Sequence, residues 1–183
     1  MERSSARKSL AVIIYNHMDP MHRRCFDRSF DFKGTTFISY ADLEEQYVLE
    51  NLDLCRKHSD YKFVIETVLV VRKFLERHPE LTGELRRLSN EGKLYVSGCG
   101  DNIIDVNMVL GESIVRNFLS GLLWVEETLG QKTRLANRFD AFGNSAQLPQ
   151  ILRGCELPWC TGLLYTRPAG GRYWRGLDGS TIL

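Results

Sequence analysis

Two acidic turns, each directly after a short apolar run, hold the residue types best suited to chemistry. The first, His17-Met18-Asp19-Pro20, follows the run 10–15, and the second, which contains Asp140, follows the run 133–137. Short apolar runs that end in turn residues are typical of buried strands in a parallel sheet, and α/β folds build their sites from loops at the carboxyl ends of such strands. One imidazole and two carboxylates meeting at that edge would make a metal site of nitrogen and oxygen ligands, of the kind that zinc accepts.

Each turn taken alone also has a plainer interpretation. Asp19 before Pro20 can simply stabilise a turn, with His17 bonded to the backbone, and Asp140 before Ala-Phe-Gly can do the same. Their shared position at strand ends favours the site, because carboxylates gathered in a cleft repel one another unless a cation lies between them. Glu66 ends another predicted strand, where contact with the cleft and a plain surface position are equally good interpretations.

Strand and helix signals alternate along the chain and must position these turns. The predicted strands are 10–15, 61–65, 94–97, 133–137 and 162–165, the last leading to Arg167. The first predicted helix opens at Ser39 or Asp42, and a second follows the strand 61–65 and runs to His78, where Pro79 interrupts it. Further helices are predicted at 81–90, at 112–129 with Gly130 as its stop, and in a short segment capped by Ser145. Residues 22–37 read as a loop. The alternation predicts an α/β fold with a parallel sheet: a β/α-barrel-like domain, incomplete, with about five β-α units of a seven- to eight-stranded barrel.

Composition limits the class of protein and its partners. The chain has 183 residues, of which 43% are hydrophobic and 26% charged, with a net charge of +1, so no global field would recruit nucleic acid or a membrane. Residues 1–9 form a polar N-terminal extension without a secretory apolar region, and no run approaches a membrane span. The five cysteines are odd in number and include no CxxC pair, which favours reduced thiols and a cytoplasmic location. Cys155 and Cys160 as metal ligands is the weaker alternative.

Several motifs in order then resemble a known family. HMDP, EGKLYVSGCG with GESIVRNFLSG, and RFDAFGNSAQLPQIL are similar to the amino-terminal catalytic domain of the zinc-dependent retaining α-mannosidases, glycoside hydrolase family 38. The similarity runs from about residue 10 to residue 183. It implies that 10–183 is the N-terminal portion of a glycoside hydrolase β/α catalytic domain, truncated at its C-terminus.

The resemblance also implies roles for individual residues. His17, Asp19 and Asp140 match zinc ligands, and Asp140 also matches the nucleophile. Phe142 matches an aromatic of the sugar-binding wall, and Arg167 matches an arginine that lines the same pocket. His22 stands where the family has tryptophan, so it could stack on a sugar, bind a hydroxyl or approach the metal; Asn144 replaces a histidine.

The family's acid/base aspartate and last zinc-ligand histidine lie beyond residue 183. Asp178, in a Gly-rich turn, is a poor candidate for the acid, so we expect the isolated chain to be inactive. The implied partner is an oligosaccharide with terminal mannose, and a homo-oligomeric full-length enzyme stays open. Two other functions stay open as well. One is a metal-dependent carbohydrate esterase or deacetylase, although such an enzyme holds its metal mainly with histidines, which are scarce near the predicted cleft. The other is a catalytically dead sugar-binding domain.

Overall fold

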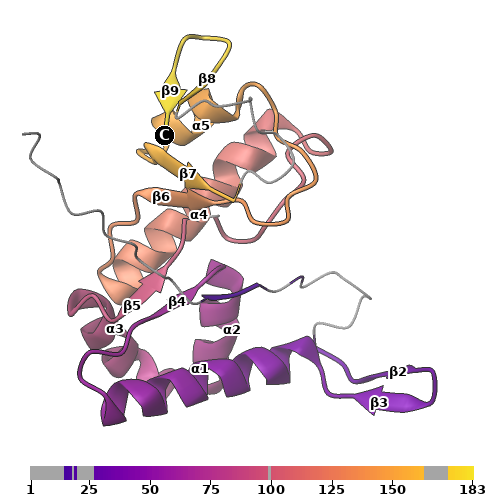
Figure 1. The fold of residues 1–183 in the computed structure, drawn as a ribbon, viewed down its shortest axis with the longest axis vertical. Helices are drawn as coiled ribbons and strands as arrows, with labels where there is room; N and C mark the ends of the chain where they lie inside the picture. The colour runs from indigo at the N-terminus through magenta and orange to yellow at the C-terminus, as the bar shows by residue number, and fades with distance from the viewer. Residues whose placement is uncertain (1–14, 18, 20–26, 99, 163–172) are drawn as a thin grey trace, which may run out of the picture.

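The computed structural model describes residues 15–17, 19, 27–98, 100–162 and 173–183 (Figure 1). The strands are β1 Tyr15–Asn16, β2 Phe30–Phe32, β3 Thr35–Phe37, β4 Phe63–Ile65, β5 Leu94–Val96, β6 Leu135–Asn137, β7 Trp159–Thr161, β8 Trp174–Arg175 and β9 Thr181–Ile182. The helices are α1 Tyr40–Lys57, α2 Val68–Arg77, α3 Thr82–Asn90, α4 Gly111–Leu129 and α5 Leu148–Gly154, with a 3-10 turn at Pro79–Leu81.

Parallel strands form the centre of the fold. Strands β1, β4 and β5 pair in that order, with Tyr15 opposite Val64 and Val64 opposite Tyr95, and β6 pairs in parallel with β7. The two groups are joined where the Gly98 amide donates to the Leu135 carbonyl at 2.7 Å. The predicted mixed α/β fold with parallel strands is therefore confirmed. Residues 10–14 of the first predicted strand lie outside the described residues.

Local signals explain where the long helices begin and end. The Ser39 hydroxyl accepts a hydrogen bond from the Asp42 amide at 3.1 Å, so Ser39 caps α1 as predicted. Gly130 ends α4 with a φ of 72°, a left-handed conformation that glycine adopts without steric cost.

Two element boundaries differ from the prediction. Helix α5 begins at Leu148 with Gln147 as its cap, because Ser145 forms a turn before the helix: its Oγ accepts from the Gln147 amide at 3.3 Å and its carbonyl from the Leu148 amide at 2.9 Å. The strand expected at 162–165 begins earlier, as β7, and Gly162 follows it with a φ of 81°. Residues 163–165 lie outside the described part of the chain.

Two antiparallel hairpins were not predicted. The segment expected as a loop contains β2 and β3, joined by Lys33 and Gly34, whose φ values of 50° and 80° suit a tight hairpin turn. Near residue 183, where a further strand was expected to begin, β8 and β9 pair antiparallel.

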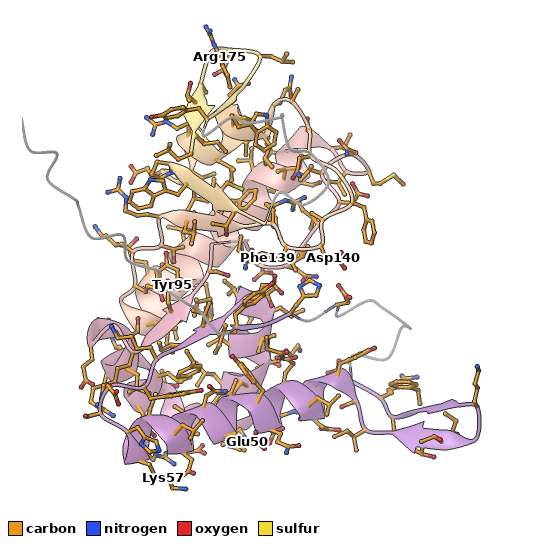
Figure 2. The ribbon with its side chains drawn as sticks, in the orientation of Figure 1. Glu50, Lys57, Tyr95, Phe139, Asp140 and Arg175 are labelled. Carbon is orange, nitrogen blue, oxygen red and sulfur yellow. The ribbon has the colours of Figure 1, made fainter. Side chains whose placement is uncertain are left out.

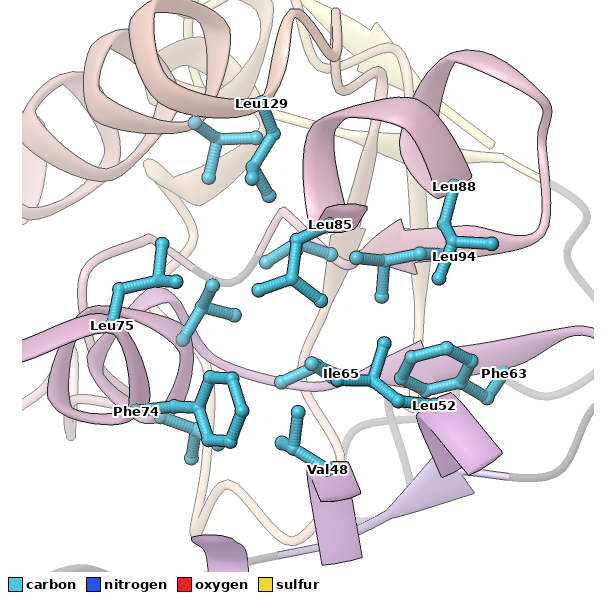
Figure 3. Close-up of a cluster of buried hydrophobic side chains, with 14 of the residues drawn as sticks. Val48, Leu52, Phe63, Ile65, Phe74, Leu75, Leu85, Leu88, Leu94 and Leu129 are labelled. Atoms are coloured by element: carbon cyan, nitrogen blue, oxygen red, sulfur yellow. The ribbon is translucent and has the colours of Figure 1, made fainter. Parts of the chain in front are cut away.

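Two hydrophobic cores are connected by α4. The first gathers side chains of α1, α2, α3, β4, β5 and the second half of α4, including Leu52, Phe74 and Leu129 (Figure 3). The second gathers α5, β6, β7, β9 and the first half of α4, including Phe118. Within the described residues Cys55, Cys155 and Cys160 are buried free thiols, and no helix is long and apolar enough to cross a membrane.

Candidate active site

His17, Asp19 and Asp140 meet at the carboxyl ends of the parallel strands. His17 directly follows β1, and Asp140 lies three residues after the end of β6, between the two halves of the molecule (Figure 2). The His17 Nε2 atom lies 3.2 Å from Asp19 Oδ1 and 3.8 Å from Asp140 Oδ2. One ligand atom from each of the three side chains lies within 4.8 Å of the others. The structure thus brings together the three residues that the sequence predicts as metal ligands.

This donor set fits a zinc-sized ion. Tetrahedral zinc with bonds of about 2.1 Å separates neighbouring ligand atoms by roughly 3.4 Å, a value that lies between the two distances from His17 Nε2. The Nε2 atom is buried and has no hydrogen-bond partner, although it faces two carboxylates. Side-chain exposures of 27% for His17, 48% for Asp19 and 39% for Asp140 leave the position open to a ligand from solvent.

Glu66 lies on the other side of the His17 ring. Its Oε2 atom is 2.8 Å from His17 Nδ1, and its side chain is 2% exposed. The Glu66 Oε1 atom is 3.5 Å from Asn137 Nδ2, and its backbone carbonyl accepts a hydrogen bond from Ser97 Oγ at 2.8 Å. Glu66, Ser97 and Asn137 stand at the ends of β4, β5 and β6, so the sheet itself builds this buried polar cluster.

The turn that contains Asp140 is held in an unusual conformation. Asp140 has a φ of 53°, a left-handed value that costs most side chains free energy and that occurs often at functional sites. Beside it, the fully buried Arg138 donates from Nε to Asn144 Oδ1 at 3.1 Å and from Nη1 to the Ile104 carbonyl at 2.8 Å. Phe139 stacks on Tyr15, with ring centroids 4.7 Å apart, which joins this turn to β1.

A cleft of about 390 Å³ lies beside His17 and Asp19. Tyr40, Tyr47 and Glu44 of α1 line it, and its volume lies within the usual range for small-molecule sites. Burial raises the pKa of Glu44 to about 7; a hydrogen bond from Asn16 opposes the shift, Glu66 adds to it, and His17 opposes it.

The other predicted residues have mixed outcomes. Phe142 is 74% exposed, two residues after Asp140. His22 and Arg167 lie outside the described residues. Asp178 accepts a hydrogen bond from Ser180 Oγ, which lowers the pKa of its carboxyl, so it stabilises the β8–β9 turn and is not suited to be an acid.

Sequence reasoning left Glu66 undecided and did not single out Ser97 or Asn137. The signal was present, because each is a polar residue at the end of a buried strand, the same feature that drew attention to His17. The rule that strand ends share one edge applies to these residues equally well.

The sequence is similar to a known protein family. Residues 8–183 match the profile described as "Glycosyl hydrolases family 38 N-terminal domain". The chain belongs to glycosyl hydrolase family 38. The predicted membership in a glycosidase family is therefore confirmed.

Relatives in this family are named as α-mannosidases. Alpha-mannosidase 2C1 of Mus musculus is 30% identical over 141 residues, which are 71% of this chain and 13% of the relative. Alpha-mannosidase G of Dictyostelium discoideum is 31% identical over 134 residues, 69% of this chain and 12% of the relative. The chain thus spans about an eighth of the length of these relatives.

A solved structure of an α-mannosidase from Enterococcus faecalis V583 shares the fold. It superposes with a TM-score of 0.69 at 24% identity, covering 78% of this chain and 17% of that one. At this identity the likeness shows the fold alone, and the predicted partial barrel is consistent with it.

Proposed function

We propose that this chain contributes the nucleophile and metal-binding half of an α-mannosidase active site, which hydrolyses terminal α-mannosides of oligosaccharides with retention of configuration. The observation that carries the proposal is the approach of His17 Nε2 to carboxylate oxygens of Asp19 and Asp140 at 3.2 and 3.8 Å. Family membership and the α-mannosidase names of the relatives support the substrate class.

Asp140 would act as the nucleophile. Its carboxylate oxygen forms a bond to the anomeric carbon while the bond from that carbon to the leaving oxygen breaks; a second carboxylic acid then protonates that oxygen. Water then attacks the anomeric carbon and gives a proton to the carboxylate that the acid has become, while the bond to Asp140 breaks; the double displacement retains configuration. We assign the acid to none of the described residues, because the Asp178 carboxylate accepts a hydrogen bond from Ser180 within its own turn.

His17, Asp19 and Asp140 would hold a divalent metal ion, for which we propose zinc. Such an ion would supply Lewis-acid binding of the sugar hydroxyls next to the nucleophile and would help to distort the ring toward the transition state. The chain's own residues supply the rest: the left-handed turn aims Asp140, and Phe142 offers an exposed aromatic face to the sugar. His22 and Arg167 are proposed as further substrate contacts.

Zinc calorimetry on the chain tests the metal site. We expect the wild type to bind one ion and His17→Ala to bind it far more weakly, because the only nitrogen donor of the set is removed. His58→Ala is the matched control, since His58 caps the far end of α1 and should leave binding unchanged. Equal binding by wild type and His17→Ala would contradict the assignment.

Turnover of an aryl α-mannoside by the full-length protein tests the nucleophile. Asp140→Asn is the sharpest variant, because asparagine tolerates the left-handed backbone that Asp140 adopts but is a poor nucleophile. We expect loss of nearly all activity with unchanged folding. Retained turnover in this variant would refute the role of Asp140.

A further inference from the structure

Among the residues that the structure describes, Glu66 contacts the His17 ring on the side away from the proposed metal position. Its carboxylate reaches Nδ1 at 2.8 Å, whereas Asp19 and Asp140 face Nε2. Glu66 is also the buried member of the three acids, at 2% exposure against 48% and 39%. The contacts of Glu66 with Asn137 and Ser97 hold it at the junction of three strand ends.

The chemistry of this contact determines which ring nitrogen is available. When Glu66 is ionised its carboxylate only accepts hydrogen bonds, and the 2.8 Å contact then places a proton on His17 Nδ1. A neutral imidazole carries one N–H, and its other nitrogen then keeps a lone pair. That other nitrogen is Nε2, which is buried, makes no hydrogen bond and lies next to the two carboxylates.

We propose that Glu66 is a positioning residue, which fixes His17 in the Nδ1–H tautomer and so presents its Nε2 lone pair between Asp19 and Asp140. This inference rests on the proposed function, because it supplies the orientation that the metal site needs. Histidine ligands in proteins commonly donate their second N–H to a carboxylate, and removing that partner typically weakens metal affinity about 10- to 100-fold.

Nitrogen-15 NMR of the His17 ring in the wild-type chain tests the tautomer directly at pH 8. We expect a proton on Nδ1 and none on Nε2 before zinc is added, and a change of the Nε2 signal alone when zinc binds. A proton on Nε2, with or without one on Nδ1, would overturn the proposal. This measurement needs no variant, so it decides the matter even if substitutions at Glu66 impair folding.

Zinc calorimetry on Glu66 variants tests the consequence. We expect Glu66→Ala to weaken binding about 10- to 100-fold. Glu66→Gln should recover part of the loss, because its amide oxygen still accepts the Nδ1 proton while its charge is gone.

Glu44→Gln is the matched control for charge. Glu44 is a second buried carboxylate beside the site, bonded to Asn16 and not to His17. With a pKa raised to about 7 by burial, it is ionised at pH 8. Glu44→Gln should weaken zinc binding less than Glu66→Gln; equal losses would mean that charge alone matters and would overturn the positioning role.

The outcomes separate this inference from the proposed function. Zinc binding that is lost in His17→Ala but intact in a folded Glu66→Ala overturns only the role of Glu66. A wild type that binds no zinc removes the metal from the proposed function, and the tautomer of metal-free His17 then decides the role of Glu66 by itself.

Discussion

Glu44 should make the stability of this protein fall as the pH rises from 5 to 8. The residue is 7% exposed, and Asn16 Nδ2 donates to its carboxylate at 2.6 Å. Burial raises its pKa from 4.5 to about 7. The folded chain therefore holds this proton more tightly than the unfolded chain, so the stabilisation is complete below pH 4.5 and is lost as the pH passes through 7.

The size of the effect follows from the two pKa values. At about 1.4 kcal/mol per pKa unit, the difference between the folded and unfolded pKa values sets an upper limit of about 3 kcal/mol on the stabilisation. About 2 to 3 kcal/mol of it is lost between pH 5 and 8. In a chain of this length that corresponds to a shift in melting temperature of roughly 5 to 10 °C. Glu44→Gln keeps an acceptor for Asn16 but cannot ionise, so the variant should lack this component.

Urea denaturation of both proteins at several pH values measures the difference. The free energy of unfolding of the wild type should decline relative to Glu44→Gln as the pH rises. Glu91→Gln is a suitable control, because Arg87 lowers the pKa of this exposed carboxyl and it stays ionised throughout the range. A constant difference between wild type and Glu44→Gln from pH 5 to 8 would refute the reasoning.

Three further substitutions test the packing by urea denaturation. Gly162→Ala should lower the free energy of unfolding by at least about 2 kcal/mol. Its φ is 81°, and a Cβ there would lie 2.5 Å from a backbone nitrogen and 2.7 Å from a backbone carbon of residues 138–139. A variant as stable as the wild type would contradict this contact. Gly83→Ala in α3 meets nothing within 4 Å and should stabilise by up to about 1 kcal/mol. Phe118→Ala should cost about 3 to 5 kcal/mol, since the ring is fully buried in the second core, and a smaller loss would mean that the cavity collapses.

The sequence predicted those elements whose signals are local and strong. Helices α1 and α4 have a clear apolar face, and Ser39 and Gly130 mark their ends. The hairpin of β2 and β3 was not predicted, because its turn uses Lys33 at a positive φ, where asparagine or aspartate would have been the expected signal. Helix α5 begins later than predicted because Ser145 starts a turn that precedes the helix, in which its Oγ accepts from the Gln147 amide and its carbonyl accepts from the Leu148 amide.

The candidate site could be predicted only in part for a similar reason. His17, Asp19 and Asp140 follow predicted strands, so the topology alone places them at one edge. The partnership of Glu66 with His17 depends on which ring nitrogen faces which carboxylate, and no spacing in the sequence encodes that choice. The turn that contains Asp140 likewise includes a contact between Arg138 and the Ile104 carbonyl, which lies far away in the chain.

Because both hydrophobic cores include side chains of α4, a metal ion at the site would affect how cooperatively the two halves of the fold unfold. His17 and Glu66 come from the half that contains β1 and β4, whereas Asp140 comes from the half that contains β6. An ion bound by both halves would resist their separation, and a ligand at 100 times its dissociation constant adds about 2.7 kcal/mol to the stability of the state that binds it. Amide hydrogen exchange along α4, from Ile114 to Leu129, would then slow on zinc binding even though this helix supplies none of the proposed ligands.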